Sequence, residues 1–130
     1  MKEKKAKDAS PAKNLNMYQL KVVLEGLPVW RRLLVREDIT LGFLHAAIQV
    51  AVGWTNSHLH QFEIGGKLYS DPRTNDDSFD DSPSVINEGK TRLMDVVKAA
   101  GSEFIYEYDF GDSWMHIITV EKIYAPEPAI

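Results

Sequence analysis

The sequence is most constrained between residues 104 and 120, where large side chains recur at every second position. Eight such side chains flank a Gly-Asp pair: Phe104, Tyr106, Tyr108, Phe110, Trp114, His116, Ile118 and Val120. A period of two is typical of β-strands, because successive side chains point to opposite faces of a sheet. Glycine and aspartate between two such runs indicate a reversal of the chain. The stretch therefore predicts a β-hairpin with one aromatic and apolar face.

Two registers of this hairpin are compatible with the sequence. A two-residue loop, 111–112, would pair Asp109 with Trp114 and divide the aromatic residues between the faces. A three-residue loop, 111–113, would give the pairs Phe110–Trp114, Tyr108–His116 and Tyr106–Ile118. A slip of one residue exchanges the two faces of a strand. We prefer the second register, because it collects the aromatic side chains, which bury large areas, on one face.

The composition fits a cytoplasmic protein with one folded domain. A chain of 130 residues that is 44% hydrophobic is of the size and composition of one domain. Without cysteine it forms neither disulfides nor zinc-thiolate sites nor thiol nucleophiles. No apolar run has the length of a signal peptide or a membrane span. We expect a single domain over residues 16–124, a disordered basic tail over 1–15 and a short tail over 125–130.

Charge is unevenly distributed along the chain. Residues 1–14 hold five lysines against two carboxylates, a net charge of +3, so the remaining residues carry −7 of the total of −4. An acidic domain repels the phosphate backbone of nucleic acids. Contact with nucleic acid is therefore expected, if anywhere, through the Lys-rich tail, which is otherwise a solvated end. No membrane contact is expected.

The remaining elements follow from periodicity and from residues that stop helices and strands. Strands are predicted over 17–24, 29–36, about 58–64 and 67–69, helices over 41–52 and 91–100, and an acidic loop over 71–87. This pattern predicts an α+β fold. Its sheet is expected to be mixed or mainly antiparallel, with about five to six strands and two helices packed on one face.

The helix at 41–52 is predicted to be amphipathic. Thr40 is a good N-cap and Gly53 a good stop. Five apolar residues form the expected buried stripe: Leu41, Leu44, Ile48, Ala51 and Val52. His45 and Gln49 are expected on the opposite side.

Histidines and aspartates are the candidates for chemistry. His58 and His60 share a strand face, and with His116 and Asp109 or Asp112 they would supply imidazole and carboxylate ligands for zinc or iron. A histidine beside aromatic residues is more commonly a hydrogen-bonded structural residue, so no metal or other cofactor is predicted. Paired aspartates also serve acid–base catalysis. We favour a role in the turn, more strongly for Asp112 than for Asp109.

Arginine and aromatic residues supply further candidate binding groups. Arg32 follows Trp30, and an inward guanidinium would need a carboxylate such as Asp109; a structural ion pair is preferred to an anion site. The rings of Trp54, Trp114, Tyr106 and Tyr108 could stack on bases or small ligands, as aromatic surfaces do in single-strand binders. Packing in the core is the default interpretation of these rings.

Several motifs resemble a known family. Pro28-Val-Trp-Arg-Arg32, Thr40-Leu41, Gly53-Trp54, His58-Leu-His60-Gln-Phe62 and Tyr106-x-Tyr-Asp-Phe-Gly-Asp-x-Trp-x-His116-x-Ile resemble, in order, the plasmid pRi ORF-three-like family. The resemblance implies a small bacterial or archaeal α+β domain, in some members associated with plasmids or insertion elements, and no established activity. Many longer relatives continue beyond the last strand, so a function of that extension is not expected here. No recombinase signature is present.

Three classes of function remain after this survey. A non-catalytic binding or protein-interaction module is favoured, with a protein or a small ligand as partner, because no complete catalytic motif is found. The first alternative is a small metal-dependent or acid–base enzyme that uses His60, His116, Asp109 and Asp112. The second is an accessory protein of a mobile element that contacts nucleic acid through the Lys-rich tail.

Overall fold

The computed structural model describes residues 14–73 and 85–126. Within these ranges the elements are β1 (Met17–Leu24), β2 (Val29–Arg36), α2 (Leu41–Val52), β3 (His60–Ile64), β4 (Lys67–Ser70), β5 (Val85–Asn87), the 3-10 helix η1 (Glu88–Lys90), α3 (Leu93–Val96), β6 (Glu103–Tyr108) and β7 (Trp114–Tyr124). The Lys-rich tail and most of the predicted acidic loop lie outside the described residues. No described helix has the length and apolar character needed to cross a membrane.

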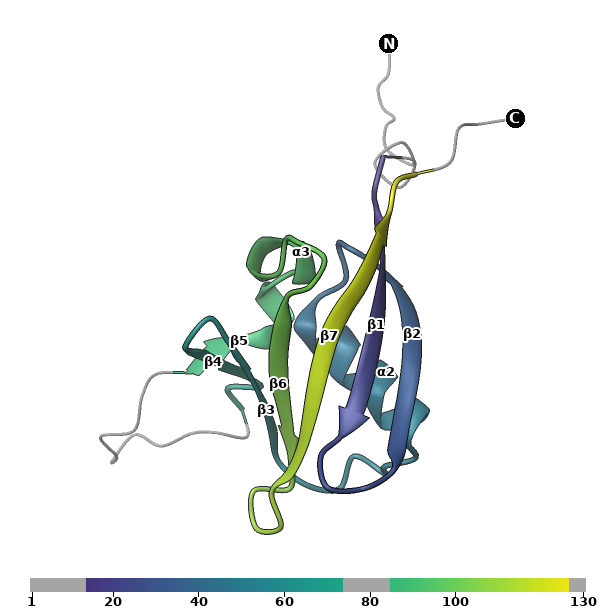
Figure 1. Cartoon of the computed structure of the whole chain (residues 1–130). Coiled ribbons are helices and arrows are strands. Elements are labelled where there is room, and N and C mark those ends of the chain that lie inside the picture. Colours follow the sequence, from purple (N-terminus) through teal and green to yellow (C-terminus); the bar gives the residue numbers. More distant parts are fainter. Residues whose placement is uncertain (1–13, 74–84, 127–130) are drawn as a thin grey trace.

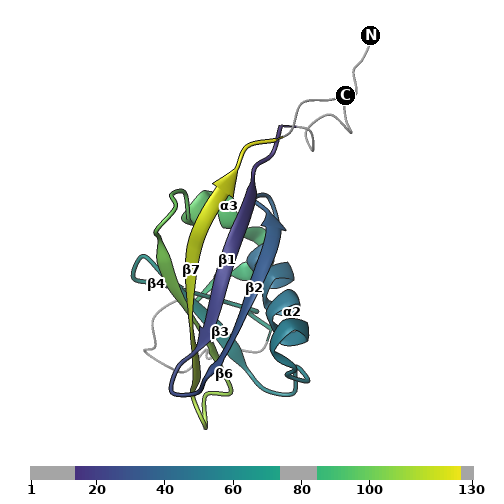
Figure 2. The ribbon, with the colours of Figure 1, turned by 45° about the vertical axis from the view of Figure 1, so that its right-hand side comes forward.

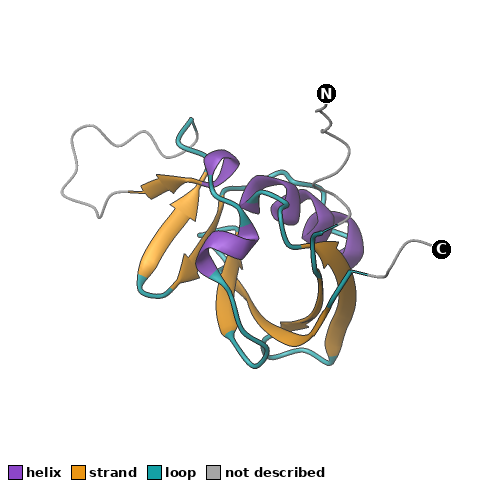
Figure 3. Ribbon diagram, turned by 90° about the horizontal axis from the view of Figure 1, so that it is seen from above, coloured by secondary structure: helices purple, strands orange, loops and turns teal. Residues whose placement is uncertain are grey.

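The described strands form one seven-stranded mixed sheet in the order β2-β1-β7-β6-β3-β4-β5 (Figure 1). β4 and β5 are parallel, and every other neighbouring pair is antiparallel. β7 is the longest strand and pairs with β1 over the whole length of β1 (Figure 2). Figure 3 shows that the sheet is curved and that α2 and α3 lie on the same side of it. The predicted α+β class is confirmed, with seven strands rather than five or six.

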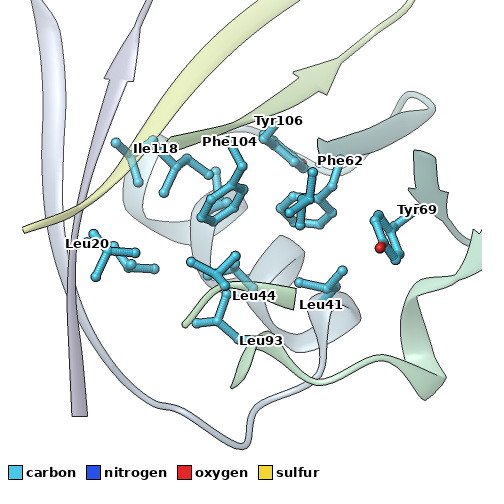
Figure 4. Close-up of a cluster of buried hydrophobic side chains, with 14 of the residues drawn as sticks. Leu20, Leu41, Leu44, Phe62, Tyr69, Leu93, Phe104, Tyr106 and Ile118 are labelled. Atoms are coloured by element: carbon cyan, nitrogen blue, oxygen red, sulfur yellow. The ribbon is translucent and has the colours of Figure 1, made fainter. Parts of the chain in front are cut away.

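The core lies between the sheet and the described helices α2 and α3. Every second residue of β1 is buried, from Tyr18 to Leu24, as its alternation predicts. Figure 4 shows leucines of α2 and α3 facing aromatic and aliphatic residues of the sheet: Leu20, Leu41, Leu44, Phe62, Leu93, Phe104, Tyr106 and Ile118. Tyr18 extends from β1 and donates its hydroxyl to the Val97 carbonyl oxygen at 2.7 Å, which ties the end of α3 to the sheet.

The predicted bounds of α2 are confirmed, but the predicted orientation of its polar residues is wrong. Thr40 Oγ1 accepts from the Phe43 amide at 3.1 Å, and Gly53 ends the helix with φ of 95°. His45 and Gln49 are 7% and 4% exposed, so they lie on the buried side. The helix contains no charged residue, and its outer side is as apolar as its inner side. The apolar stripe of α2 therefore does not identify the side that faces the sheet. That side is determined by the polar partners that His45 and Gln49 find in the core.

The predicted register of the β6–β7 hairpin is also wrong, although the predicted face is retained. The observed pairs are Tyr108–Trp114, Tyr106–His116 and Phe104–Ile118, which leaves a five-residue loop, 109–113. The strand ends early because Asp109 has φ of 64° and its Oδ1 accepts from the amides of Gly111 at 3.2 Å and Asp112 at 3.4 Å. Phe110 is consequently exposed, and the turn role expected mainly of Asp112 belongs to Asp109.

The predicted helix over 91–100 is much shorter in the structure. It comprises only α3, because Val97 returns to an extended backbone, with φ of −134°. Thr91, the first residue of the predicted helix, instead ends η1 and donates its hydroxyl to the Asn87 carbonyl oxygen at 3.0 Å. Leu93 and Val97 are buried. The segment that precedes α3 supplies β5, the additional parallel strand.

A glycine inside α2 and the glycine at its end provide a matched stability test. Gly53→Ala should lower the free energy of unfolding by about 1 kcal/mol, because alanine is strained at a positive φ. Gly42→Ala should raise it by up to about 1 kcal/mol, because alanine favours helix and its Cβ would meet Glu88 atoms at an ordinary contact distance of 3.7 Å. Urea unfolding measures both changes. Equal effects of the two substitutions would contradict the assigned end of the helix.

Candidate functional site

A cavity of about 900 Å³ opens beside the N-terminal half of α2. Its walls come from α2, the segment 56–60, the segment 71–73 and the segment 87–89. Nine polar side chains line it: His45, Asn56, Ser57, His58, His60, Asp71, Arg73, Asn87 and Glu88. These residues come from distant parts of the sequence, and the fold brings them together because β3 pairs with β4, β4 pairs with β5, and η1 follows β5 at once.

A buried histidine and carboxylate pair forms one wall of this pocket. His60 Nε2 lies 2.8 Å from Glu88 Oε1 and 2.9 Å from Oε2, and both side chains are more than nine-tenths buried. A carboxylate can only accept, so Nε2 carries a proton. Among the described residues, His60 Nδ1 has no hydrogen-bond partner. The pair therefore provides a nitrogen that is free to exchange a proton, held in place by a carboxylate.

His45 stacks on His60 in parallel. The ring centroids are 3.5 Å apart, and the ring planes differ by 6°. Burial lowers the pKa of His45, and the nearby charge of His60 lowers it further. Two imidazolium rings at this separation would repel each other strongly. Burial and this stacking therefore both favour a neutral His45.

The backbone N–H of Asn56 fixes which atoms donate and which accept in the hydrogen bonds around His45. The Asn56 amide can only donate, so Gln49 Oε1 accepts from it at 2.7 Å, and Gln49 Nε2 then donates to the Tyr106 hydroxyl at 2.8 Å. Tyr106 uses its own proton toward His45 Nδ1 at 2.6 Å. His45 is therefore protonated on Nε2, which donates to Asn56 Oδ1 at 2.9 Å. We call these four residues the Tyr106 network.

Tyr106 is suited to this role because it is completely buried. Burial raises the pKa of its hydroxyl far above the ordinary value, so the group stays protonated. It extends from β6 across the core to α2, and its hydroxyl meets side chains that are one helical turn apart, at 45 and 49. The network thus joins the sheet, the helix and the loop that follows the helix.

His116 lies on the far side of Tyr106 and is separately satisfied. The Trp54 indole N–H can only donate, so His116 Nε2 accepts from it at 3.1 Å. His116 Nδ1 then carries the proton and donates to the Tyr106 carbonyl oxygen at 3.1 Å. Burial lowers the pKa of His116. This histidine does not line the pocket. Its hydrogen bonds fit the role of a structural residue, which is the commoner role of a histidine beside aromatic residues.

The aromatic candidates pack against one another around His116. The Trp54 ring lies 5.2 Å from the Tyr108 ring and 5.6 Å from the Trp114 ring, between ring centroids. The Tyr108 hydroxyl accepts from the Ser57 amide at 2.8 Å, which holds the segment 55–59 at the mouth of the pocket. Trp54 and Trp114 are half-buried and belong to the edge of the core. Neither ring lines the pocket, and both pack against the core, which was the default interpretation.

The aspartates and Arg32 lie outside the pocket. Asp109 caps its turn and has Oδ2 at 3.7 Å from His58 Nδ1, and Asp112 is exposed in the same loop. Arg32 lies on the opposite face of the sheet, where Nε donates to Glu121 Oε1 at 2.7 Å and Nη2 to Oε2 at 3.0 Å. Its partner is thus Glu121. Pairing with Asp109 was expected only of an inward guanidinium, whereas the Arg32 side chain is 47% exposed and points outward. Arg32 does form an ion pair, which was preferred to an anion site.

The proposed metal ligands do not converge. His60 faces Glu88, His58 faces Asp109, and His116 faces Trp54. Within residues 14–73 and 85–126, no group of three or more histidine and acidic side chains has a geometry that could hold a metal ion. The pocket that the structure does assemble contains two of the candidate histidines, His58 and His60.

Sequence reasoning missed His45, Gln49 and Glu88. A signal for the first two was present, because a histidine and a glutamine four residues apart share one side of a helix that is otherwise apolar. No local signal existed for Glu88. Its pairing spans 28 residues of sequence and depends on the parallel strand β5, which precedes it.

Tyr106→Phe tests the Tyr106 network. The substitution removes the hydroxyl and leaves Gln49 Nε2 and His45 Nδ1 without their partner in the core. We expect a loss of about 1–3 kcal/mol in the free energy of unfolding, measured with urea. Tyr124→Phe is the control, because that hydroxyl donates to Gln19 Oε1 at an exposed position and should matter by less than about 0.5 kcal/mol. Equal losses would argue against the network.

Comparisons with known proteins agree with this fold and assign no activity. The chain is similar to the uncharacterized protein y4hQ of Sinorhizobium fredii (strain NBRC 101917 / NGR234), with 37% identity over 112 residues that cover 84% of this chain and 55% of the relative. It thus spans about half the length of that relative. The crystal structure of a protein of unknown function, MM3350 from Methanosarcina mazei Go1, matches 90% of this chain and 66% of its own with 31% identity and a TM-score of 0.72.

The family model that matches the chain agrees with the resemblance found in its motifs. It is described as plasmid pRiA4b ORF-3-like protein and covers residues 16–130, which include every strand and helix described above. With this coverage and the similarity to y4hQ, the chain belongs to the plasmid pRiA4b ORF-3-like family.

Proposed function

We propose that the protein is a binding module that takes a small polar ligand in the pocket beside α2. The observation that carries this proposal is the convergence of His45 with the buried His60–Glu88 pair in the wall of a 900 Å³ cavity. Pockets for small ligands are concave, have volumes of about 300–1,000 Å³ and contain a few well-placed polar groups. The cavity has this size and this kind of lining.

The lining indicates the chemistry of the ligand. Glu88 offers carboxylate oxygens and His60 an imidazole nitrogen, while Asn56 and Asn87 supply amides at the rim. Asp71 and Arg73 lie together at the mouth, joined by an ion pair of 2.8 Å, so the entrance carries both signs of charge. A neutral or zwitterionic molecule with several hydrogen-bonding groups fits this lining better than an apolar one or a polyanion.

Acid–base catalysis in the same pocket is the second candidate. It is favoured by one observation, the carboxylate-bound imidazole of His60 with its second nitrogen free of protein partners among the described residues. Such a pair can move a proton to or from a bound hydroxyl or amide. The residues for this chemistry are His60 and Glu88. His116, Asp109 and Asp112, the other members of the enzyme hypothesis, do not line the cavity.

A fragment screen with the full-length protein tests the binding proposal. The probes are neutral and zwitterionic polar compounds of under about 300 Da, at millimolar concentration, and the readout is the amide spectrum of isotope-labelled protein. We expect hits that shift the signals of residues around the pocket, above all His58, His60 and Gly89. Glu88→Gln should weaken these hits at least about tenfold, because the carboxylate is a main recognition group.

Glu121→Gln is the control for this experiment. Glu121 is also an ion-paired carboxylate, but it pairs with Arg32 on the opposite face of the sheet, and its substitution should leave the hits unchanged. Hits that cluster outside the pocket, or that are indifferent to Glu88→Gln, would contradict the proposal. Chemical conversion of a bound hit, lost in His60→Gln, would select the enzyme over the binding module.

A further inference from the structure

The outer side of α2 is an apolar surface that the described residues leave uncovered. Phe43 is 72% exposed and Val50 is 82% exposed, and between them lie Ala46 and Ala47. Figure 2 shows α2 at the edge of the molecule, with its outer side turned away from the sheet. A helix that is apolar on all sides is normally buried on all sides. We call this surface the α2 outer face; it consists of Phe43, Ala46, Ala47 and Val50. An exposed apolar face of this kind is normally covered by a binding partner.

We propose that the α2 outer face is a self-association surface, on which a second copy of this chain packs with its own α2 antiparallel. The four residues have the spacing i, i+3, i+4 and i+7, which is the seam used in helix–helix packing. Their order is large, small, small, large, and it is symmetric about the midpoint between Ala46 and Ala47. A two-fold axis at that midpoint places Phe43 of each copy against Val50 of the other.

Charge supports a second copy as the occupant. α2 contains no charged residue over its 12 positions, so a two-fold axis brings no like charges together. In an antiparallel pair, the positive N-terminal end of each helix also lies beside the negative C-terminal end of the other. A strongly charged partner would find no complementary group on this face. The small side chains at the centre let the two backbones approach closely.

The size of the surface determines how tight the association is. A helix of 12 residues is about 18 Å long. One such helix pair buries less than the about 1,200 Å² that is usual for a stable interface. The dimer is therefore weak and reversible, and it forms over about 0.05–1 mM protein.

Two charge variants test the antiparallel arrangement, and both keep the helix stable. Phe43→Glu completes a capping box with Thr40, and Val50→Lys places a cation in the last turn, where the helix dipole favours it. Each variant alone should dimerise at least about tenfold more weakly than the wild type, because its charge faces an apolar residue of the second copy. An equimolar mixture should dimerise again. In the mixed dimer the introduced glutamate faces the introduced lysine across one half of the interface, while Val50 still faces Phe43 across the other.

Sedimentation equilibrium of the full chain provides the measurement. The wild type should approach twice the monomer mass as its concentration rises to 1 mM, and each single variant should weaken the dimer at least about tenfold. Leu34→Glu is the control, because Leu34 is 59% exposed but its side chain lies with Arg32 on the face of the sheet opposite to α2, and its substitution should have no effect. Circular dichroism verifies that each variant is folded. A monomeric wild type, a dimer that persists in Phe43→Glu, or a mixture that stays monomeric would overturn the proposal.

Discussion

The hydroxyl of Tyr106 is the polar group around which the interior is arranged. It is completely buried, and it is surrounded by apolar residues of the sheet and of α2. A buried hydroxyl without hydrogen bonds would cost a few kcal/mol. Gln49 and His45 remove this cost by donating to it and accepting from it. This requirement determines which side of α2 faces the sheet, because only that side carries polar groups.

The same hydrogen bonds position the pocket. His45 and Gln49 extend the network to Asn56, and Tyr108 holds the neighbouring Ser57, so the loop after α2 is anchored to the sheet through two tyrosines. His45 also presents its ring face to His60, which Glu88 holds from the other side. The pocket wall therefore has one imidazole nitrogen without a partner among the described residues, Nδ1 of His60, and a second imidazole that burial keeps neutral. An arrangement of this kind is suited to recognising a polar ligand and to transferring a proton to it.

Local signals in the sequence were sufficient for most of the elements. The bounds of β1, β2 and α2 were predicted to the residue, because alternation, Pro28, the Thr40 cap and the Gly53 stop all act within a few positions. The hairpin loop was mispredicted because Asp109 adopts a positive φ, which a count of alternating residues does not reveal. The length of α3 and the strand β5 depend on packing against distant segments, and they were not predicted.

The candidate site was less predictable than the fold, because its residues are also brought together by packing between distant segments. Motif reasoning selected His60, but it assigned the carboxylate to Asp109 or Asp112, which are near in the motif and not in the pocket. The actual carboxylate, Glu88, reaches His60 only because β4 and β5 are parallel. His45 was placed on the outer side of an amphipathic helix. In a helix without charge on either face, the position of a hydrogen-bonding partner in the sheet decided the orientation.

The protonation of His45 and His116 tests this account most directly. Nitrogen-15 NMR of the imidazole rings distinguishes which ring nitrogen carries the proton. At pH 7 the network predicts opposite tautomers, with the proton on Nε2 in His45 and on Nδ1 in His116, and both rings should remain neutral as the pH falls through the ordinary histidine pKa of 6.5. The same tautomer in both rings, or a pKa for His45 at or above 6.5, would contradict the hydrogen bonds assigned around Tyr106.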